Sequence, residues 1–105
     1  MANNWNIPDW LEKKIRHRDK TCIYCGVKFK NNNYDRASWE HIENDASKIS
    51  ELNIALCCRA CNSSKGTKDI EDWLNAEYCK KKNITKKTVA GIVRKHINAK
   101  SRGQI

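Results

Sequence analysis

Two pairs of cysteines constrain the fold of this chain more than any other feature of its sequence. Cys22 and Cys25 form one C-x2-C pair, and Cys58 and Cys61 form a second. A gap of two residues lets both thiolates of a pair bind one tetrahedral ion, and four sulfurs complete the coordination of zinc. The alternative is a set of four buried thiols. The spacing favours a structural zinc site that joins two distant segments of the chain.

Cys57 adjoins the second pair and would give a C-x3-C gap if it replaced Cys58 as a ligand. Neighbouring residues of a strand point to opposite faces, so these two cysteines do not bind the same ion comfortably. The two-residue gap favours Cys58. Cys57 and Cys79 are then expected to be small core residues, as free cysteines usually are.

The size of the chain makes a metal staple useful. At 105 residues it has the length of one domain, and a domain this small buries a limited fraction of its surface. Its 39% of hydrophobic residues, against 31% of charged ones, is typical of a globular protein. We expect a single domain over residues 1–105, with much of its core formed by Trp5, Trp10, Trp39 and Trp73.

Hydrophobic spacing predicts helices at both ends of the chain and two strands between them, an α+β arrangement. An N-terminal helix is expected over about 8–18, with Pro8 at a tolerated first-turn position. Two short apolar stretches, 38–42 and 53–57, are suited to strands. The polar residues 43–52 between them are expected to form an irregular connection or a helical turn.

The last third of the chain favours helix. A helical turn after Cys61 is expected to be interrupted by Gly66. A second amphipathic helix is indicated by the helical spacing of Ile70, Trp73, Leu74 and Tyr78. Thr85 is expected to cap a final helix. The apolar stripe of that helix comprises Val89, Ile92, Val93, His96 and Ile97.

The positive charge of the chain is concentrated at its C-terminal end. The formal net charge is +9, yet residues 1–79 carry 12 basic and 12 acidic side chains. The whole excess lies in the segment 80–102, which comprises Lys80, Lys81, Lys82, Lys86, Lys87, Arg94, Lys95, Lys100 and Arg102. Such a cluster indicates a polyanionic partner, and the alternative is a solubilising tail.

The N-terminal residues 1–9 lack the apolar segment of a signal peptide, and no apolar run approaches membrane-spanning length. These features predict a soluble, intracellular protein of the cytoplasm, with no membrane partner. In such a compartment cysteines are more often metal ligands or free thiols than disulfides.

Polar residues stand in a characteristic order between and directly after the cysteine pairs. Glu40 directly precedes His41, Asn53 follows, and Asn62 comes directly after the last cysteine. The order C-x2-C, acid-His, Asn, C-x2-C-N resembles the HNH nucleases, also called ββα-metal nucleases, in the variant whose last signature residue is Asn. The resemblance covers about residues 18–68. It implies a small zinc-stapled ββα-metal domain, a β-hairpin plus a helix, with flanking helices.

The resemblance also implies a role for each of these residues. Glu40 would be a metal ligand, Asn62 a second ligand, His41 the general base, and Asn53 the residue that holds His41. Carboxylate and amide oxygens suit Mg²⁺ or Mn²⁺. A positioned histidine that activates water, together with a cation on the phosphate, supports hydrolysis of phosphodiester bonds in DNA.

The chain departs from the commonest pattern of that family at two positions. Many members carry Asp or His in place of Glu40, and His in place of Asn62, which leaves the preferred metal open. A regular strand would also turn Glu40 and His41 to opposite faces. Since the resemblance implies that both reach one phosphate, we expect a strand end or a local irregularity there.

Nucleic-acid contacts are expected from the basic C-terminal helical segment, 80–102, and from Lys65, which could meet a phosphate or be merely solvated. A rival interpretation is a non-catalytic zinc module that binds nucleic acid through this segment. Another is the same chemistry on RNA, since a base, a metal and a phosphate do not identify the sugar. The chain could act as a homodimer or as a component of a larger nuclease system, in a bacterial or phage setting.

Overall fold

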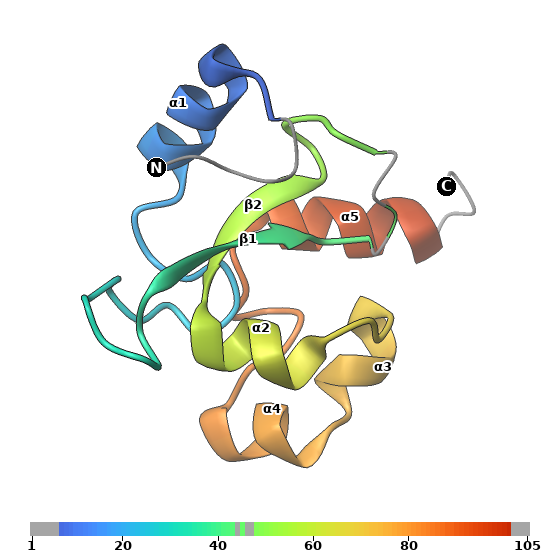
Figure 1. The fold of residues 1–105 in the computed structure, drawn as a ribbon. Coiled ribbons are helices and arrows are strands. Elements are labelled where there is room, and N and C mark those ends of the chain that lie inside the picture. Colours follow the sequence, from blue (N-terminus) through green and yellow to red (C-terminus); the bar gives the residue numbers. More distant parts are fainter. Residues whose placement is uncertain (1–6, 44, 46–47, 102–105) are drawn as a thin grey trace.

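A computed structural model of the chain describes residues 7–43, 45 and 48–101, and only the backbone of 100 and 101. Within these residues a β-hairpin lies at the centre, with α1 on one side and α2 to α4 on the other (Figure 1). The elements are, in order, α1 (Asp9–Arg18), β1 (Ala37–His41), β2 (Ile54–Cys58), α2 (Arg59–Lys65), α3 (Ile70–Leu74), α4 (Glu77–Lys82) and α5 (Gly91–Ser101). The expected α+β fold, a β-hairpin plus a helix with flanking helices, is confirmed.

The two strands pair antiparallel, with Ala37 opposite Cys58 and His41 opposite Ile54. Every residue of β2 is buried. A strand covered on both faces needs apolar residues at every position, and the run from Ile54 to Cys58 meets that need. Both strands lie within one residue of the ranges that the sequence predicts.

Helix α1 begins and ends where the sequence predicts it. The carbonyl of Pro8 accepts hydrogen bonds from the backbone of Leu11 and Glu12, so proline stands directly before the first turn. Leu11 and Ile15 are buried against the hairpin. The prediction that Trp10 belongs to the core is wrong, because its side chain is 66% exposed.

Among the other tryptophans, Trp39 and Trp73 belong to the core. Trp5 lies outside the described residues. The core is divided by the sheet into two clusters. The smaller one joins α1 to Trp39, Ile54 and Leu56, and the larger one joins the cysteine-rich loop to the C-terminal helices.

The single helix expected around residues 70–78 is two short helices. Asp69 caps α3 through a hydrogen bond from the backbone of Glu71. The chain then breaks at Ala76, whose backbone is extended, before α4 begins. On either side of the break, two aromatic side chains make different contacts. The Trp73 indole donates to Ser64, and the Tyr78 hydroxyl donates to a cysteine sulfur. Tertiary contacts thus override the helical spacing.

The final helix begins at Gly91 and not at Thr85 as expected. Thr88 accepts from the backbone of Thr85 through its hydroxyl, which closes a local turn in place of a helix. The backbone of Ala90 then donates to the carbonyl of Ile23 at 2.8 Å and ties the chain to the cysteine-rich loop. As a result Lys86 and Lys87 lie in a turn before α5.

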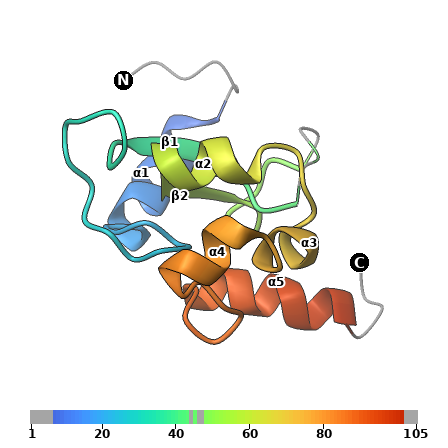
Figure 2. The ribbon, with the colours of Figure 1, turned by 90° about the horizontal axis from the view of Figure 1, so that it is seen from below.

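Helix α5 lies on the opposite side of the molecule from α2 (Figure 2). Among the described residues, no helix combines the length and the apolar character that crossing a membrane would require.

Candidate functional site

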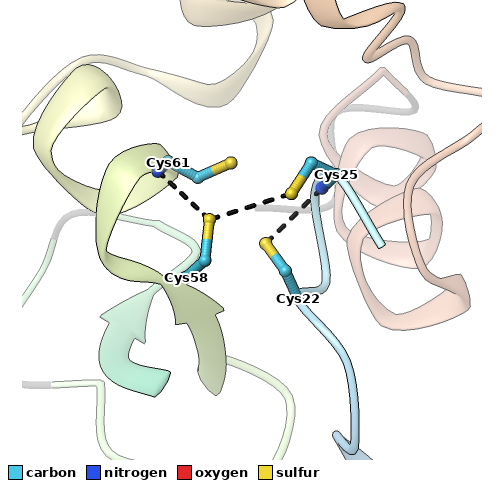
Figure 3. Close-up of side chains that lie close together, drawn as sticks. All are labelled: Cys22, Cys25, Cys58 and Cys61. Atoms are coloured by element: carbon cyan, nitrogen blue, oxygen red, sulfur yellow. Dashed lines mark hydrogen bonds between the residues drawn. The ribbon is translucent and has the colours of Figure 1, made fainter. Parts of the chain in front are cut away.

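Four cysteines from two distant segments come together in one cluster (Figure 3). Cys22 and Cys25 come from the loop after α1, Cys58 from the end of β2, and Cys61 from the first turn of α2. Their sulfur atoms all lie within 4.8 Å of one another, and the sulfurs of Cys25 and Cys58 are 3.7 Å apart. Tetrahedral zinc with bonds of about 2.3 Å separates its sulfurs by about 3.8 Å. The geometry therefore fits a metal site of the structural zinc type.

The loop that carries the first pair is a tight knuckle. The backbone of Gly26 donates to the carbonyl of Cys22, and its φ of 78° lies in the left-handed region that favours glycine. The backbone N–H groups of Tyr24 and Cys25 both lie 3.4 Å from the sulfur of Cys22. Such donors stabilise a thiolate. In the second pair, the backbone of Cys61 makes the same contact with Cys58.

The thiol groups of the cluster interact strongly with one another. Hydrogen bonds with Cys22 and Cys61 lower the pKa of Cys58 below its usual range. The hydrogen bonds with Cys22 and Cys58, together with burial, raise the pKa of Cys61 well above its usual range. Four thiolates at these distances repel one another unless a cation offsets their charge. Metal binding would therefore release protons from the cluster.

The two remaining cysteines are buried outside the cluster, as expected. Cys57 lies near the Ser38 hydroxyl, and burial raises the pKa of its thiol. Burial likewise raises the pKa of Cys79 to about 11. The choice of Cys58 over Cys57 as the cluster member is confirmed.

Glu40 belongs to a second buried cluster, which we call the Glu40 triad: Tyr24, Glu40 and Lys65. The Tyr24 hydroxyl donates to Oε2 of Glu40 at 2.7 Å, and the Lys65 ammonium lies 3.1 Å from the same oxygen. Burial raises the pKa of Glu40, while Lys65 and Tyr24 act in the opposite direction. Burial and the carboxylate together raise the pKa of Tyr24, which stays the protonated donor.

Lys65 differs from its expected role as a phosphate contact, because its side chain is fully buried. Besides Glu40, its ammonium reaches the carbonyl oxygen of His41 at 3.5 Å. An unpaired buried charge is costly, so Lys65 is held inside as the counter-charge of Glu40. Lys65 lies three residues after Asn62 on α2, so both side chains share the face of the helix that packs on β1.

His41 is the last residue of β1, as expected, but the strand has no local irregularity there that would turn Glu40 and His41 to one side. Glu40 pairs with Ala55 and His41 with Ile54 in a regular ladder, so the two side chains leave opposite faces of the strand. Burial lowers the pKa of His41, Asp45 raises it, and Lys65 lowers it, with a net decrease. A lower pKa favours the neutral imidazole, which is the form that accepts a proton.

Asn53 fixes the chain that follows His41. Its side-chain oxygen accepts from the backbone of Glu43 at 2.7 Å, and its amide nitrogen donates to the carbonyls of Glu43 and Lys48. The backbone of Ile42 donates to its carbonyl. Asn53 therefore holds the loop beyond β1 through main-chain groups, whereas the sequence predicts that it holds His41.

Asn62 contacts the same strand from α2. Its amide nitrogen donates to the Ser38 hydroxyl and to the carbonyl of Trp39, both at 3.0 Å. Because a carbonyl accepts only from the NH₂ group, this contact fixes the orientation of the amide. Ser38 and Glu40 share one face of β1, so α2 places Asn62 and Lys65 along the face that carries Glu40.

The basic residues of the C-terminal part are spread over three neighbouring segments. All seven basic side chains described between residues 80 and 95 are exposed. They are Lys80, Lys81 and Lys82 in α4, Lys86 and Lys87 in the turn, and Arg94 and Lys95 in α5. The side chain of Lys100 and all of Arg102 lie outside the described residues. No acidic residue follows Glu77, so this surface presents positive charge.

A cleft of about 650 Å³ lies between α5 and the loop that Asn53 holds. Its walls include Lys48, Leu52 and Asn53 on one side, and Lys95 and His96 on the other. It connects the region after His41 with the basic helix α5.

Tyr24 is the residue of the site that the sequence interpretation does not identify. Its signal is its place inside the first C-x2-C pair, where a knuckle turns an aromatic hydroxyl toward the neighbouring strand.

Comparison of the chain with models of protein families, with curated proteins and with solved structures found no match.

Proposed function

We propose that this protein is a divalent-metal-dependent endonuclease of the HNH type that hydrolyses DNA, with zinc held by the four cysteines. The observations that carry the proposal are the Glu40 carboxylate and the Asn62 amide on one face of β1, and the His41 imidazole on the next residue, at the end of the strand. Zinc bound by the four cysteines would fasten β2 and α2 to the knuckle beside this strand.

The side-chain oxygen atoms of Glu40 and Asn62 fit a hard cation. Both other members of the triad contact Oε2 of Glu40, and within the described residues Oε1 accepts no hydrogen bond. The same holds for the side-chain oxygen of Asn62, whose nitrogen makes both contacts with β1. One carboxylate oxygen and one amide oxygen match what Mg²⁺ or Mn²⁺ takes from proteins when a phosphate and waters complete the shell.

His41 supplies the base. Its lowered pKa keeps the imidazole neutral near pH 7, so it can take a proton from the water that attacks phosphorus. Glu40 and Asn62 would hold the cation, which neutralises charge on the scissile phosphate when bound. Asn53 keeps the loop after His41 in place, and with it the end of the strand.

The exposed basic residues of α4, the following turn and α5 support a nucleic-acid substrate. Seven exposed cations with no acid among them would neutralise phosphates without reading sequence. DNA is the substrate that the resemblance to HNH nucleases favours. RNA offers the same phosphodiester, so the assay must include both.

The test is cleavage of supercoiled plasmid and of single-stranded RNA by purified protein, with Mg²⁺ or Mn²⁺ and with EDTA. We expect metal-dependent cleavage of DNA that EDTA abolishes and that is absent in His41→Ala. A protein that cleaves neither substrate with either metal would overturn the proposal, and cleavage of RNA alone would reassign the substrate.

The buried ion pair between Glu40 and Lys65 favours one other candidate, because a carboxylate with an internal counter-charge needs no metal. Under that alternative the chain is a zinc module that binds nucleic acid through its basic surface. It would bind plasmid as tightly as an enzyme would, and binding without cleavage distinguishes it.

A further inference from the structure

The phenol of Tyr24 is the direct link between the four-cysteine cluster and Glu40. Tyr24 stands between Cys22 and Cys25, and its own backbone N–H contacts the sulfur of Cys22. At the far end of the same side chain, the hydroxyl donates to Oε2 of Glu40 at 2.7 Å. A movement of the knuckle would therefore be transmitted directly to the carboxylate.

The ring of Tyr24 has little freedom to move. It is buried, and it packs edge-on against Trp73 with the ring centroids 4.9 Å apart. The residue before it, Ile23, accepts a hydrogen bond from the backbone of Ala90 and donates one to the carbonyl of Leu56 in β2. The backbone directly before Tyr24 is thus held by the sheet and by the segment before α5.

The two donors to Oε2 differ in how they tolerate a cation. A divalent ion at Oε1 would repel the Lys65 ammonium, because like charges in a buried site interact strongly. Tyr24 is neutral, so its hydrogen bond survives when the cation binds. A hydrogen bond from a second residue orients a ligand carboxylate and tunes its affinity for the metal.

We propose that Tyr24 is the positioning residue of the divalent-cation site: its hydroxyl fixes Oε2 of Glu40, leaves Oε1 for the cation, and couples that site to the four-cysteine knuckle. This inference rests on the proposed function, because it takes Glu40 as a metal ligand.

The experiment measures Mn²⁺ binding to zinc-loaded protein by calorimetry, without nucleic acid, in wild type and Tyr24→Phe. The substitution removes one hydroxyl and keeps the ring against Trp73. We expect one weak Mn²⁺ site in wild type and an affinity about tenfold lower in Tyr24→Phe, the lower end of the effect of such supporting contacts. Zinc content should stay at the wild-type level.

Tyr78→Phe is the matched control. Tyr78 also packs on Trp73, and its hydroxyl lies 3.3 Å from the sulfur of Cys61, yet among the described residues it makes no hydrogen bond with Glu40. Its Mn²⁺ affinity should equal that of wild type. An equal decrease in both variants would show that the effect does not depend on the hydrogen bond to Glu40 and would overturn the inference.

A spectroscopic measurement keeps the test decisive if Tyr24→Phe folds poorly. Cation binding at Glu40 should perturb the hydrogen-bonded phenol, so Mn²⁺ titration should give a tyrosine ultraviolet difference spectrum in wild type and in Tyr78→Phe. The signal should disappear in Glu40→Gln. Mn²⁺ binding with no tyrosine signal would refute the coupling alone, whereas no Mn²⁺ binding by wild type would refute the proposed cation site itself.

Discussion

The ammonium of Lys65 lies 3.1 Å from Oε2 of Glu40, and neither side chain has appreciable contact with solvent. Removing one partner of such a pair leaves the other charge buried and unmatched. The contact joins α2 to β1 across the face that carries the candidate cation site. The contribution of this ion pair to the free energy of unfolding can therefore be measured separately from any effect on catalysis.

Lys65→Met should lower the free energy of unfolding by about 3 kcal/mol, because it leaves the Glu40 carboxylate without its counter-charge. The measurement is urea denaturation of zinc-loaded protein. The double variant Lys65→Met with Glu40→Gln should regain part of that stability. Lys68→Met is the control, since Lys68 is exposed and should have little effect. Similar destabilisation in Lys65→Met and Lys68→Met would show that the pair contributes nothing specific.

Elemental analysis should find one zinc per folded chain. Cys25→Ser should lose the metal and the fold together, because a small core depends on the free energy of metal binding. Cys79→Ser should keep the metal, since the buried Cys79 lies outside the cluster. Folded protein free of zinc, or an equal decrease in zinc content in both variants, would contradict the assignment of the four ligands.

His41→Ala and Glu40→Gln should fail in different ways. Loss of the base should slow plasmid cleavage by about 10²-fold or more, and no metal concentration should restore it. Glu40→Gln keeps an acceptor for Lys65 but weakens binding of the cation, so part of its activity should return at high Mn²⁺. Both variants should retain zinc. Full activity of His41→Ala would exclude this mechanism and favour the zinc module.

The basic surface should bind phosphates without regard to sequence. Replacing Lys80, Lys81 and Lys82 by Gln should reduce the slope of log affinity against log salt by roughly 0.9 for each phosphate that is no longer neutralised. A triple replacement of Lys13, Lys20 and Lys28, which are exposed in the charge-neutral part of the chain, is the control. If both triple variants keep the wild-type slope, α4 serves solubility instead of binding.

The sequence was most informative where structure depends on local spacing. The two C-x2-C pairs predict the cysteine cluster because each pair is a short-range geometric unit, and the apolar runs predict both strands within one residue. The helix expected from Thr85 is wrong because Thr88 and Ala90 make contacts that compete with it. The burial of Lys65 depends on a partner 25 residues away in the sequence, Glu40, and no local pattern encodes it.

The division of the core by β2 has a consequence for how the molecule opens. The C-terminal end of α1 is anchored to the sheet, since Arg18 donates to the carbonyl of Ile54 and Asp19 accepts from the backbone of Leu56. Its first turn packs on the sheet through Leu11, in the smaller cluster. Amide protons of α1 should therefore exchange with solvent through a partial opening that leaves α2 and the knuckle closed. The helix would then behave as a separate cooperative unit, free to loosen while the Glu40 triad and the four-cysteine cluster stay closed.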